Sequence, residues 1–482
     1  MENELMKRNY YFAKKIEELI FREKNLDKRL DLIEFYSQFV ANNQIGMLHC
    51  VNIENHLLEI ANRFEFIYGT DQKRKSLIIM TKAYPHGGHT RIVEHLVKYS
   101  DDNSYDLVFT RKNIKVPDTL QFICKDKCCD IYVLKGTSIL DKAQELRMLG
   151  VNYNNILLHI HPEDFLPIIS FGCKDWETPI FLYNHAEHRP WFGVTITDVV
   201  MDLSSKAKEN TMKYRCAKKS EVLPMPIVEA KRNEEVNIRL REKMGIELDA
   251  IVFFSAGSEY KFSPNGEIDF KDVVEMVLDE FANSYFVIIG INREKNWKKL
   301  KNKYQNRLLL IKQTDYLQYL NYVNLADIYI DSMPVSGFTV LLEMALRKIP
   351  IIFLKTKYCF PDSIIGKAIE YKDLMIYIKE IVDNNFQQDI DMQEHKIEYF
   401  IKKHNEIIIN NRNHTLNIIR DEVVDFSDES YLSFILKSVY ANKTNIKNIG
   451  ILPFRYRILV NLMVLQLFIP LINKFSTGAT NN

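Results

Sequence analysis

Two series of short apolar runs, each run followed by a turn and a helical segment, constrain the fold of this chain most strongly. The first series contains "SLIIMT", "YDLVFT", "DIYVLK", "NILLHIH" and "PIFLYNH", and the second contains "AIVFFSAG", "SYFVIIG", "RLLLIKQ", "ADIYIDSMP" and "IPIIFLK". Such runs are typical of parallel strands buried on both faces, and their alternation with helices is typical of doubly wound α/β domains. The sequence therefore predicts an α/β fold with two doubly wound domains.

The segments around these series set the expected domain boundaries. Residues 1–66 show helical spacing, as in "KKIEELIFREKNLDKRLDLIEFYSQFV", and are predicted to be a helical lead-in that packs on the next domain or binds a partner. The first Rossmann-like domain is expected at 67–222 and the second at 223–365, because prolines and charges interrupt the pattern near 221–250. Residues 366–482 are expected to form a helical C-terminal region.

Composition excludes several classes of protein. The 482 residues include 64 Lys and Arg against 63 Asp and Glu, so no overall charge attracts nucleic acid. Seven cysteines occur without paired C-x-x-C spacing, which favours reduced thiols over a metal site, and we expect no metal and no cofactor. The N-terminus is polar and carries no signal-peptide pattern. These features are typical of a globular cytoplasmic protein.

A longer apolar segment lies near the C-terminus, at 451–475. Its uncharged part, Ile458 to Asn473, has 16 residues, whereas a membrane span needs ~20. Arg455, Arg457 and Lys474 flank this part, which favours an amphipathic helix on a membrane surface. A helix that packs on the protein and a true span are the alternatives. The preferred interpretation predicts a peripheral location on the inner face of the cytoplasmic membrane.

In the first domain, the loop after the first strand contains Gly87, Gly88 and His89. Two glycines permit a tight turn and a close backbone approach, so the loop suits a phosphate or a sugar acceptor, although a structural turn would have the same sequence. The G-x-G-x-x-G pattern of nicotinamide-binding proteins is not present.

Histidines follow two later strands of the first domain, in "ILLHIHPEDF" and "PIFLYNHAEHRPWFG". A neutral histidine can remove a proton from a hydroxyl nucleophile, and the carboxyl ends of the strands are where ligands bind in such sheets. Among His159, His161, His185 and His188, we expect His185 first and His188 second to act as a general base. A structural role is the alternative for each of them.

In the second domain, Ser255 and Gly257 end the strand "AIVFFSAG", and Lys261 follows. The small residues let the backbone approach a ligand, and a lysine at this position suits a diphosphate. A solvated lysine is the alternative.

The stretch "DSMPVSGFTVLLEM" presents a turn shaped by Pro334 and Gly337 before a helix that begins near Phe338 and Thr339. Backbone N–H groups at a helix N-terminus can bind a phosphate. Glu343 lies one turn further along and could accept hydrogen bonds from ribose hydroxyls.

Together, "FFSAGSEYKFSP" and "DSMPVSGFTVLLEMALRKIPII" resemble the donor motifs of GT-B glycosyltransferases, in particular O-GlcNAc transferases and bacterial cytoplasmic N-glucosyltransferases. The resemblance covers roughly 76–365 and implies two Rossmann-like domains that face a cleft. It implies that Lys261 holds the donor diphosphate, that Gly337 and Thr339 hold phosphate, and that Glu343 holds the ribose.

A second resemblance is to retaining family 4 glycosyltransferases, whose glycine loop is similar to "GGHTRIVEHL". That family has two glutamates eight positions apart. Only Glu343 is present in this chain, because the Val335–Ser336 region takes the place of the first glutamate. We therefore expect inversion of configuration at the transferred sugar.

The predicted activity is metal-independent transfer of a hexosyl or N-acetylhexosaminyl group from a UDP-sugar. The predicted acceptor is a hydroxyl of a glycan or glycolipid in bacterial surface polysaccharide synthesis, such as O-antigen or capsule. A UDP-sugar epimerase of the 2-epimerase type and a non-catalytic GT-B scaffold protein are the alternatives.

Overall fold

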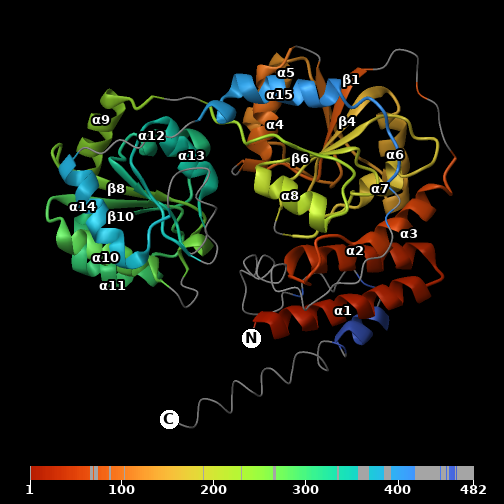
Figure 1. Cartoon of the computed structure of the whole chain (residues 1–482), viewed down its shortest axis with the longest axis horizontal. Coiled ribbons are helices and arrows are strands. Elements are labelled where there is room, and N and C mark those ends of the chain that lie inside the picture. Colours follow the sequence, from red (N-terminus) through yellow and green to blue (C-terminus); the bar gives the residue numbers. More distant parts are fainter. Residues whose placement is uncertain are drawn as a thin grey trace, which may run out of the picture. The chain divides into compact units, whose positions relative to one another are not determined.

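The structure is a computed structural model of the whole chain (Figure 1). The residues that it describes are 2–65, 69, 74–85, 88–101, 104–187, 189–228, 231–263, 268–333, 336–356, 368–384, 392–417, 419, 446, 452, 455–461 and 463. All structural statements below refer to these residues.

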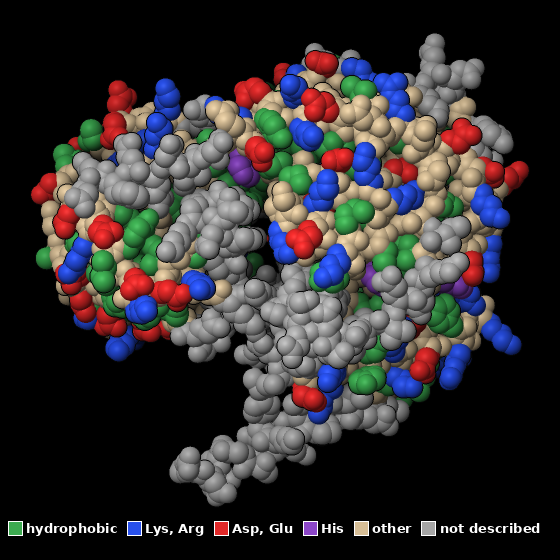
Figure 2. All heavy atoms as spheres, viewed as in Figure 1, with side chains coloured by type: hydrophobic (Ala, Val, Ile, Leu, Met, Phe, Trp, Pro, Cys, Tyr) green, Lys and Arg blue, Asp and Glu red, His purple; other side chains and the backbone are tan. Residues whose placement is uncertain are grey.

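The chain divides into two compact units, which are described separately. Unit 1 contains Met1–Tyr84, Val93–Pro224 and Ile401–Asn482, and unit 2 contains Pro85–Ile92 and Met225–Phe400. The division falls within two helices, α4 (Gly88–Tyr99) and α15 (Ile397–Ile409). On the viewed face of each unit, acidic and basic side chains are intermixed (Figure 2), as the balanced composition leads one to expect.

Unit 1 contains a seven-stranded parallel sheet with the order β3-β2-β1-β4-β5-β6-β7. Its strands are β1 (Arg74–Met80), β2 (Tyr105–Phe109), β3 (Ile131–Val133), β4 (Tyr153–His159), β5 (Ile180–Tyr183), β6 (Val199–Asp202) and β7 (Ser220–Val222). The five apolar runs of the first series correspond to β1 to β5. The sequence analysis missed the two further strands, β6 and β7.

Helices of unit 1 flank this sheet (Figure 1), and the first three of them precede its first strand in the sequence. They are α1 (Glu2–Arg22), α2 (Leu26–Asn42), α3 (Val51–Ala61), α5 (Asp118–Asp126), α6 (Ile139–Gly150), α7 (Leu166–Phe171) and α8 (Ser205–Tyr214), together with parts of α4 and α15. One apolar core joins the lead-in helices to the sheet, since Phe12 and Ile60 belong to the same buried cluster as Ile156 and Leu158. The lead-in therefore packs on the first sheet.

A buried carboxylate also fixes the lead-in to this unit. Glu54 of α3 is fully buried and accepts hydrogen bonds from the backbone N–H groups of Gly193 and Thr195, both at 2.9 Å, and from the Thr195 hydroxyl at 2.7 Å. Burial raises the pKa of Glu54 even though these three bonds favour its charged form. Losing this carboxylate would leave two buried N–H groups without an acceptor.

Unit 2 contains a five-stranded parallel sheet with the order β10-β9-β8-β11-β12. Its strands are β8 (Ile251–Ala256), β9 (Ser284–Ile289), β10 (Leu308–Ile311), β11 (Ile328–Ile330) and β12 (Ile351–Ile352), which correspond to the five runs of the second series. Its helices are α9 (Glu234–Met244), α10 (Phe270–Glu280), α11 (Lys298–Tyr304), α12 (Tyr316–Val323), α13 (Phe338–Leu346) and α14 (Leu374–Asn384). Short 3₁₀ turns occur at Glu259–Phe262, Glu294–Trp297, Gln305–Arg307, Tyr371–Asp373 and Gln393–His395.

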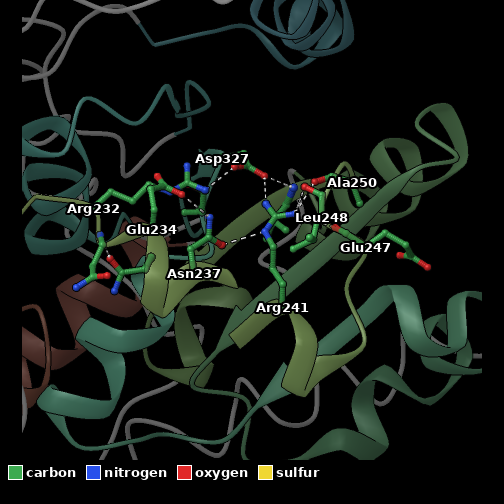
Figure 3. A network of polar contacts seen from close by, with 12 residues as sticks. Arg232, Glu234, Asn237, Arg241, Glu247, Leu248, Ala250 and Asp327 are labelled. Atoms are coloured by element: carbon green, nitrogen blue, oxygen red, sulfur yellow. Dashed lines mark hydrogen bonds and ion pairs between the residues drawn. The ribbon is translucent and has the colours of Figure 1, made fainter. Parts of the chain in front are cut away.

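A polar network connects α9 to the sheet of unit 2 at the amino ends of β8 and β11 (Figure 3). The Asp327 carboxylate accepts hydrogen bonds from Arg241 at 2.6 Å, from Arg232 at 2.9 Å and from the backbone N–H of Val252 at 2.8 Å. Arg241 is buried and also donates to Asn237 and to the carbonyl oxygen of Ala250. Asp327 therefore neutralises a buried guanidinium and orders the start of β8.

The described residues between 452 and 463 pack on unit 1. Leu452, Tyr456 and Val460 are buried, whereas Ile458 and Leu459 are exposed. The remainder of the predicted amphipathic helix at 451–475 lies outside the described residues. Among the described residues, no helix combines the length and the apolar character that crossing a membrane requires.

We expect Asp327→Ala to lower the free energy of unfolding of unit 2 by about 3 kcal/mol, because removing one partner of a buried ion pair leaves the other charge unpaired. Urea-dependent hydrogen exchange of peptides from β8 and β11 measures this effect separately from unit 1. Asp279→Ala is the matched control, since that carboxylate forms an exposed ion pair with Lys303 and its loss should have far less effect. Equal effects of the two substitutions would contradict this role of Asp327.

Candidate functional site

The topology of unit 2 marks one edge of its sheet as the place for a ligand. The first strand, β8, lies between β9 and β11, so the chain proceeds in opposite directions on the two sides of β8. In doubly wound sheets, ligands bind at the carboxyl ends of the strands beside such a switch point. The loops that follow β8 and β11 contain the two motifs that the sequence analysis singled out.

Lys261 connects these two loops. It lies in the 3₁₀ turn Glu259–Phe262 after β8, and its Nζ donates a hydrogen bond of 2.8 Å to the carbonyl oxygen of Ser336, which follows β11. Burial lowers the pKa of Lys261, and the nearby Asp331 partly opposes that effect. The two motifs, which are 75 residues apart, therefore meet through one ammonium group.

Ser255 and Gly257 precede Lys261 at the end of β8. Ser255 is fully buried, and within the described part of the chain its hydroxyl has no hydrogen-bond partner. A Cβ atom on Gly257 would lie 3.2 Å from Cδ of Lys261 and 3.4 Å from Oγ of Ser332. The loop after β8 thus brings backbone close to both Lys261 and the loop after β11.

Asp331 organises the loop after β11. Its side chain is 2% exposed, and Oδ1 accepts hydrogen bonds from the Tyr329 hydroxyl at 2.9 Å and from the backbone N–H groups of Ser332 at 2.8 Å and Gly337 at 2.9 Å. Burial raises the pKa of Asp331, although Gly337, Tyr329 and the charge of Lys261 oppose the shift. The sequence analysis missed this residue, although a carboxylate directly after the strand "IYI" was a usable signal.

The turn held by Asp331 leads into α13. Gly337 directly precedes this helix, and a Cβ atom there would lie 3.2 Å from both Asp331 Oδ1 and Tyr329 Oη, so the position favours glycine. Phe338 and Thr339 form the first turn of α13 and are half-buried. The N-terminal turn of a helix supplies N–H groups that suit an anion. Pro334 lies outside the described residues.

Glu343 lies in the middle of α13 and is 3% exposed. Its Oε1 accepts a hydrogen bond of 3.0 Å from the Tyr316 hydroxyl, and its Oε2 accepts one from the Tyr319 hydroxyl. Burial raises the pKa of Glu343, whereas the tyrosines and the charges of Arg347 and Arg91 oppose the shift. The sequence analysis missed both tyrosines, which lie three residues apart on one face of α12.

The glycine loop expected in the first domain is grouped with unit 2, because that unit includes Pro85–Ile92. A Cβ atom on Gly88 would lie 2.4 Å from Cε of Met225 and 3.6 Å from Oγ1 of Thr339. His89 is half-buried in the first turn of α4, and Gly87 lies outside the described residues. Arg91 of the same turn places its guanidinium 3.8 Å from the centre of the Tyr316 ring.

Two of the four histidines that the sequence analysis considered contact each other. His159 ends β4 and is 2% exposed, and its Nδ1 lies 3.1 Å from Nε2 of His185, which follows β5. His161 stacks on Tyr84, and its Nδ1 lies 3.4 Å from Oε1 of Glu163. His188 lies outside the described residues.

A buried arginine supports the loop that carries His185. Arg215 is 1% exposed and donates hydrogen bonds to the carbonyl oxygens of Ala186 at 3.1 Å, Glu187 at 2.6 Å and Arg189 at 2.7 Å. The sequence offered no signal for this role, because strand β6 and helix α8 separate Arg215 from His185 along the chain. The loop conformation therefore depends on a distant charge.

Comparisons with known proteins found similar solved structures at low sequence identity. It is similar to the solved structures of the lipopolysaccharide outer core galactosyltransferase WaaB (15% identity, 70% of this chain and 99% of that chain, TM-score 0.48) and of the Thermobaculum terrenum O-GlcNAc transferase (11%, 95% and 83%, TM-score 0.39). A third is UDP-GlcNAc 2-epimerase from Neisseria meningitidis (11%, 70% and 100%, TM-score 0.47). No family model and no curated protein sequence matches the chain. Glycosyltransferases are thus among the solved structures that the chain is similar to.

We expect Gly290→Ala to destabilise unit 2 at least twice as much as Gly245→Ala. Both glycines have a positive φ, +105° and +67°, so either alanine introduces backbone strain of about 1–2 kcal/mol. A Cβ atom on Gly290 would also lie 1.8 Å from the carbonyl oxygen of Gly257, whereas Gly245 has no neighbour within 4 Å. Hydrogen exchange of the 251–262 segment in urea measures both variants. Equal destabilisation would show that Gly290 does not support the Lys261 loop.

Proposed function

We propose that the chain is a metal-independent glycosyltransferase that transfers a hexosyl or N-acetylhexosaminyl group from a UDP-sugar to a hydroxyl of a glycan or glycolipid. The observation that carries the proposal is the hydrogen bond from Lys261 to Ser336, which unites the two donor-like motifs at the switch point of unit 2. Lys261 supplies one positive charge there, and the first turn of α13 supplies backbone N–H groups. Both features suit a diphosphate.

In the proposed reaction, the acceptor hydroxyl oxygen forms a bond to C1 of the sugar as the bond from C1 to the diphosphate oxygen breaks. The nucleotide diphosphate leaves with the electron pair, and its added negative charge is stabilised by Lys261 and the N-terminus of α13. His185 removes the proton of the acceptor hydroxyl. A single displacement of this kind inverts the configuration at C1.

Glu343 has a defined place in this proposal. Tyr316 and Tyr319 hold its two carboxylate oxygens in one orientation, and each oxygen has a second lone pair that can accept a ribose hydroxyl. The tyrosines thus position the Glu343 carboxylate, which accepts hydrogen bonds from the ribose hydroxyls in this proposal. The fully buried hydroxyl of Ser255 is a further group at this edge that could bond a donor oxygen.

The first experiment tests the nucleotide site. We expect the purified protein, with EDTA present, to release a nucleotide diphosphate from one member of a panel of UDP-, GDP- and TDP-sugars. Lys261→Ala should weaken nucleotide diphosphate binding by about 10- to 100-fold, since a hydrogen bond to a charged group is lost. Lys295→Ala changes an exposed lysine of the same unit and is the matched control.

The same experiment separates the alternatives. If EDTA abolished the release of nucleotide diphosphate and magnesium restored it, the proposed stabilisation of the leaving group by Lys261 and α13 would be refuted. A changed sugar without an acceptor product would identify an epimerase, and failure of every nucleotide to bind would indicate a non-catalytic scaffold.

Nucleotide binding should also depend on pH through Lys261. Burial lowers the pKa of Lys261, and a bound diphosphate raises it again because the anion favours the ammonium form. Between the lowered pKa and the pKa in the complex, binding therefore takes up a proton and affinity falls as pH rises. Calorimetry in buffers of different ionisation enthalpy measures this uptake, which Lys261→Ala should abolish.

We also propose that the protein acts at a membrane surface on a lipid-linked acceptor of bacterial surface polysaccharide synthesis. The support is the segment near 455–461, where Ile458 (47% exposed) and Leu459 (39% exposed) lie beside Arg455 and Arg457. An apolar surface bordered by basic residues suits an anionic lipid surface.

We expect Ile458→Ser combined with Leu459→Ser to reduce cosedimentation with vesicles that contain anionic lipid by at least fivefold. This double variant spares the buried Leu452, Tyr456 and Val460, so the contacts of the segment with unit 1 are retained. Unchanged sedimentation relative to the unaltered protein would refute the proposed membrane surface.

A further inference from the structure

We infer that His159 is a positioning residue that accepts a hydrogen bond from Nε2–H of His185 and thereby makes Nδ1 of His185 the nitrogen that takes the acceptor proton. This inference deepens the proposed function and rests on it. Its basis is the distance of 3.1 Å between His159 Nδ1 and His185 Nε2.

The sheet brings these two rings together. β4 and β5 are neighbouring parallel strands in which Leu158 pairs with Leu182, so His159 ends one strand beside Tyr183 at the end of the next. The Tyr183 ring stacks on His159 at a centroid distance of 5.3 Å and lies 4.9 Å from His185 at a tilt of 43°. The Tyr183 hydroxyl donates to the carbonyl oxygen of Leu223 at 3.2 Å. Both imidazoles therefore pack against one anchored aromatic ring.

The backbone of His185 is held from the other side. Asn184 donates a hydrogen bond of 2.7 Å to Asp202, and its own side-chain oxygen accepts one of 3.1 Å from the N–H of Ala186. Arg215 holds the carbonyl oxygens of Ala186 and Glu187. These bonds fix the backbone on both sides of His185, so its ring extends from a defined point of the loop.

The tautomers of the pair decide what His185 can do. A hydrogen bond between two neutral imidazoles needs one N–H and one lone pair. If His159 accepts, the proton of neutral His185 is on Nε2 and its Nδ1 lone pair can act as a base. If His159 donates, the proton of neutral His185 is on Nδ1. His185 then has no lone pair left to take the proton of the substrate hydroxyl. General base catalysis by His185 therefore requires His159 to be the acceptor.

The same bond assists proton removal. When His185 has taken the acceptor proton, it is an imidazolium whose Nε2–H still donates to neutral His159, so the positive charge is stabilised in a buried place. The two rings cannot both be protonated without losing this bond. Among the described residues, the titratable or charged groups near the pair include Tyr183 on β5, Glu187 in the same loop, Asp202 at the end of β6 and Arg215 after α8.

Two substitutions at position 159 separate the hydrogen bond from the ring. His159→Phe keeps an aromatic ring against Tyr183 but has no acceptor, whereas His159→Asn keeps an acceptor oxygen near the position of Nδ1. His404→Phe is the control for loss of a buried histidine in unit 1, because His404 is 1% exposed and contacts Tyr105 at the amino end of β2.

We expect His159→Phe to lower kcat by about 10- to 100-fold without changing KM for the donor. The acidic limb of its pH–rate profile should move to lower pH, because the imidazolium of His185 loses its acceptor. His159→Asn should recover most of kcat, and His404→Phe should leave kcat unchanged. An unaltered pH profile in His159→Phe, with donor turnover intact in the wild type, would overturn the inference.

A measurement without substrate tests the pair even if no donor is found. In ¹⁵N-histidine spectra of the whole protein, neutral His159 should carry its proton on Nε2, and His185 should carry its own on Nε2, with assignments from the position-159 variants and His185→Gln. Neutral His159 with its proton on Nδ1 would overturn the inference. Absence of turnover with every sugar nucleotide would instead refute the proposed function.

Discussion

The site depends on one geometric constraint, which is that parallel strands end at the same edge of a sheet. In each sheet the first strand lies inside the order, between β2 and β4 in unit 1 and between β9 and β11 in unit 2. Loops that leave such a switch point diverge, so side chains after neighbouring strands can surround a ligand instead of packing on each other. The Lys261 loop and the His159–His185 pair both lie at carboxyl ends of strands.

Buried charges then fix what the strand order brings together. Asp331, Glu343 and Arg215 are each at most 3% exposed, and each is satisfied by several hydrogen bonds, because an uncompensated buried charge would cost several kcal/mol. Asp331 has a second effect, since its charge favours the ammonium form of Lys261 against burial. Lys261 therefore keeps part of its positive charge in spite of burial.

The sequence predicted ten of the twelve described strands and the helical lead-in, because burial on two faces or along one helical stripe leaves a local pattern of apolar residues. It did not predict β6 and β7. At the candidate site it indicated Lys261 and the turn before α13, since lysine, glycine and threonine after a strand have recognisable chemistry. Asp331, Arg215, Tyr316 and Tyr319 were missed, because their importance comes from partners in other elements.

By itself, the sequence determined two doubly wound sheets and the identity of the groups that follow their strands, since hydrophobic period and turn chemistry act over a few residues. Only the tertiary structure decided which of those groups meet. It joined Lys261 to Ser336 across 75 residues and His159 to His185 across 26. It also engaged both oxygens of Glu343 with tyrosine hydroxyls. Hydrogen bonds act over about 3 Å, so their partners are set by strand order and loop conformation, which no local stretch of sequence contains.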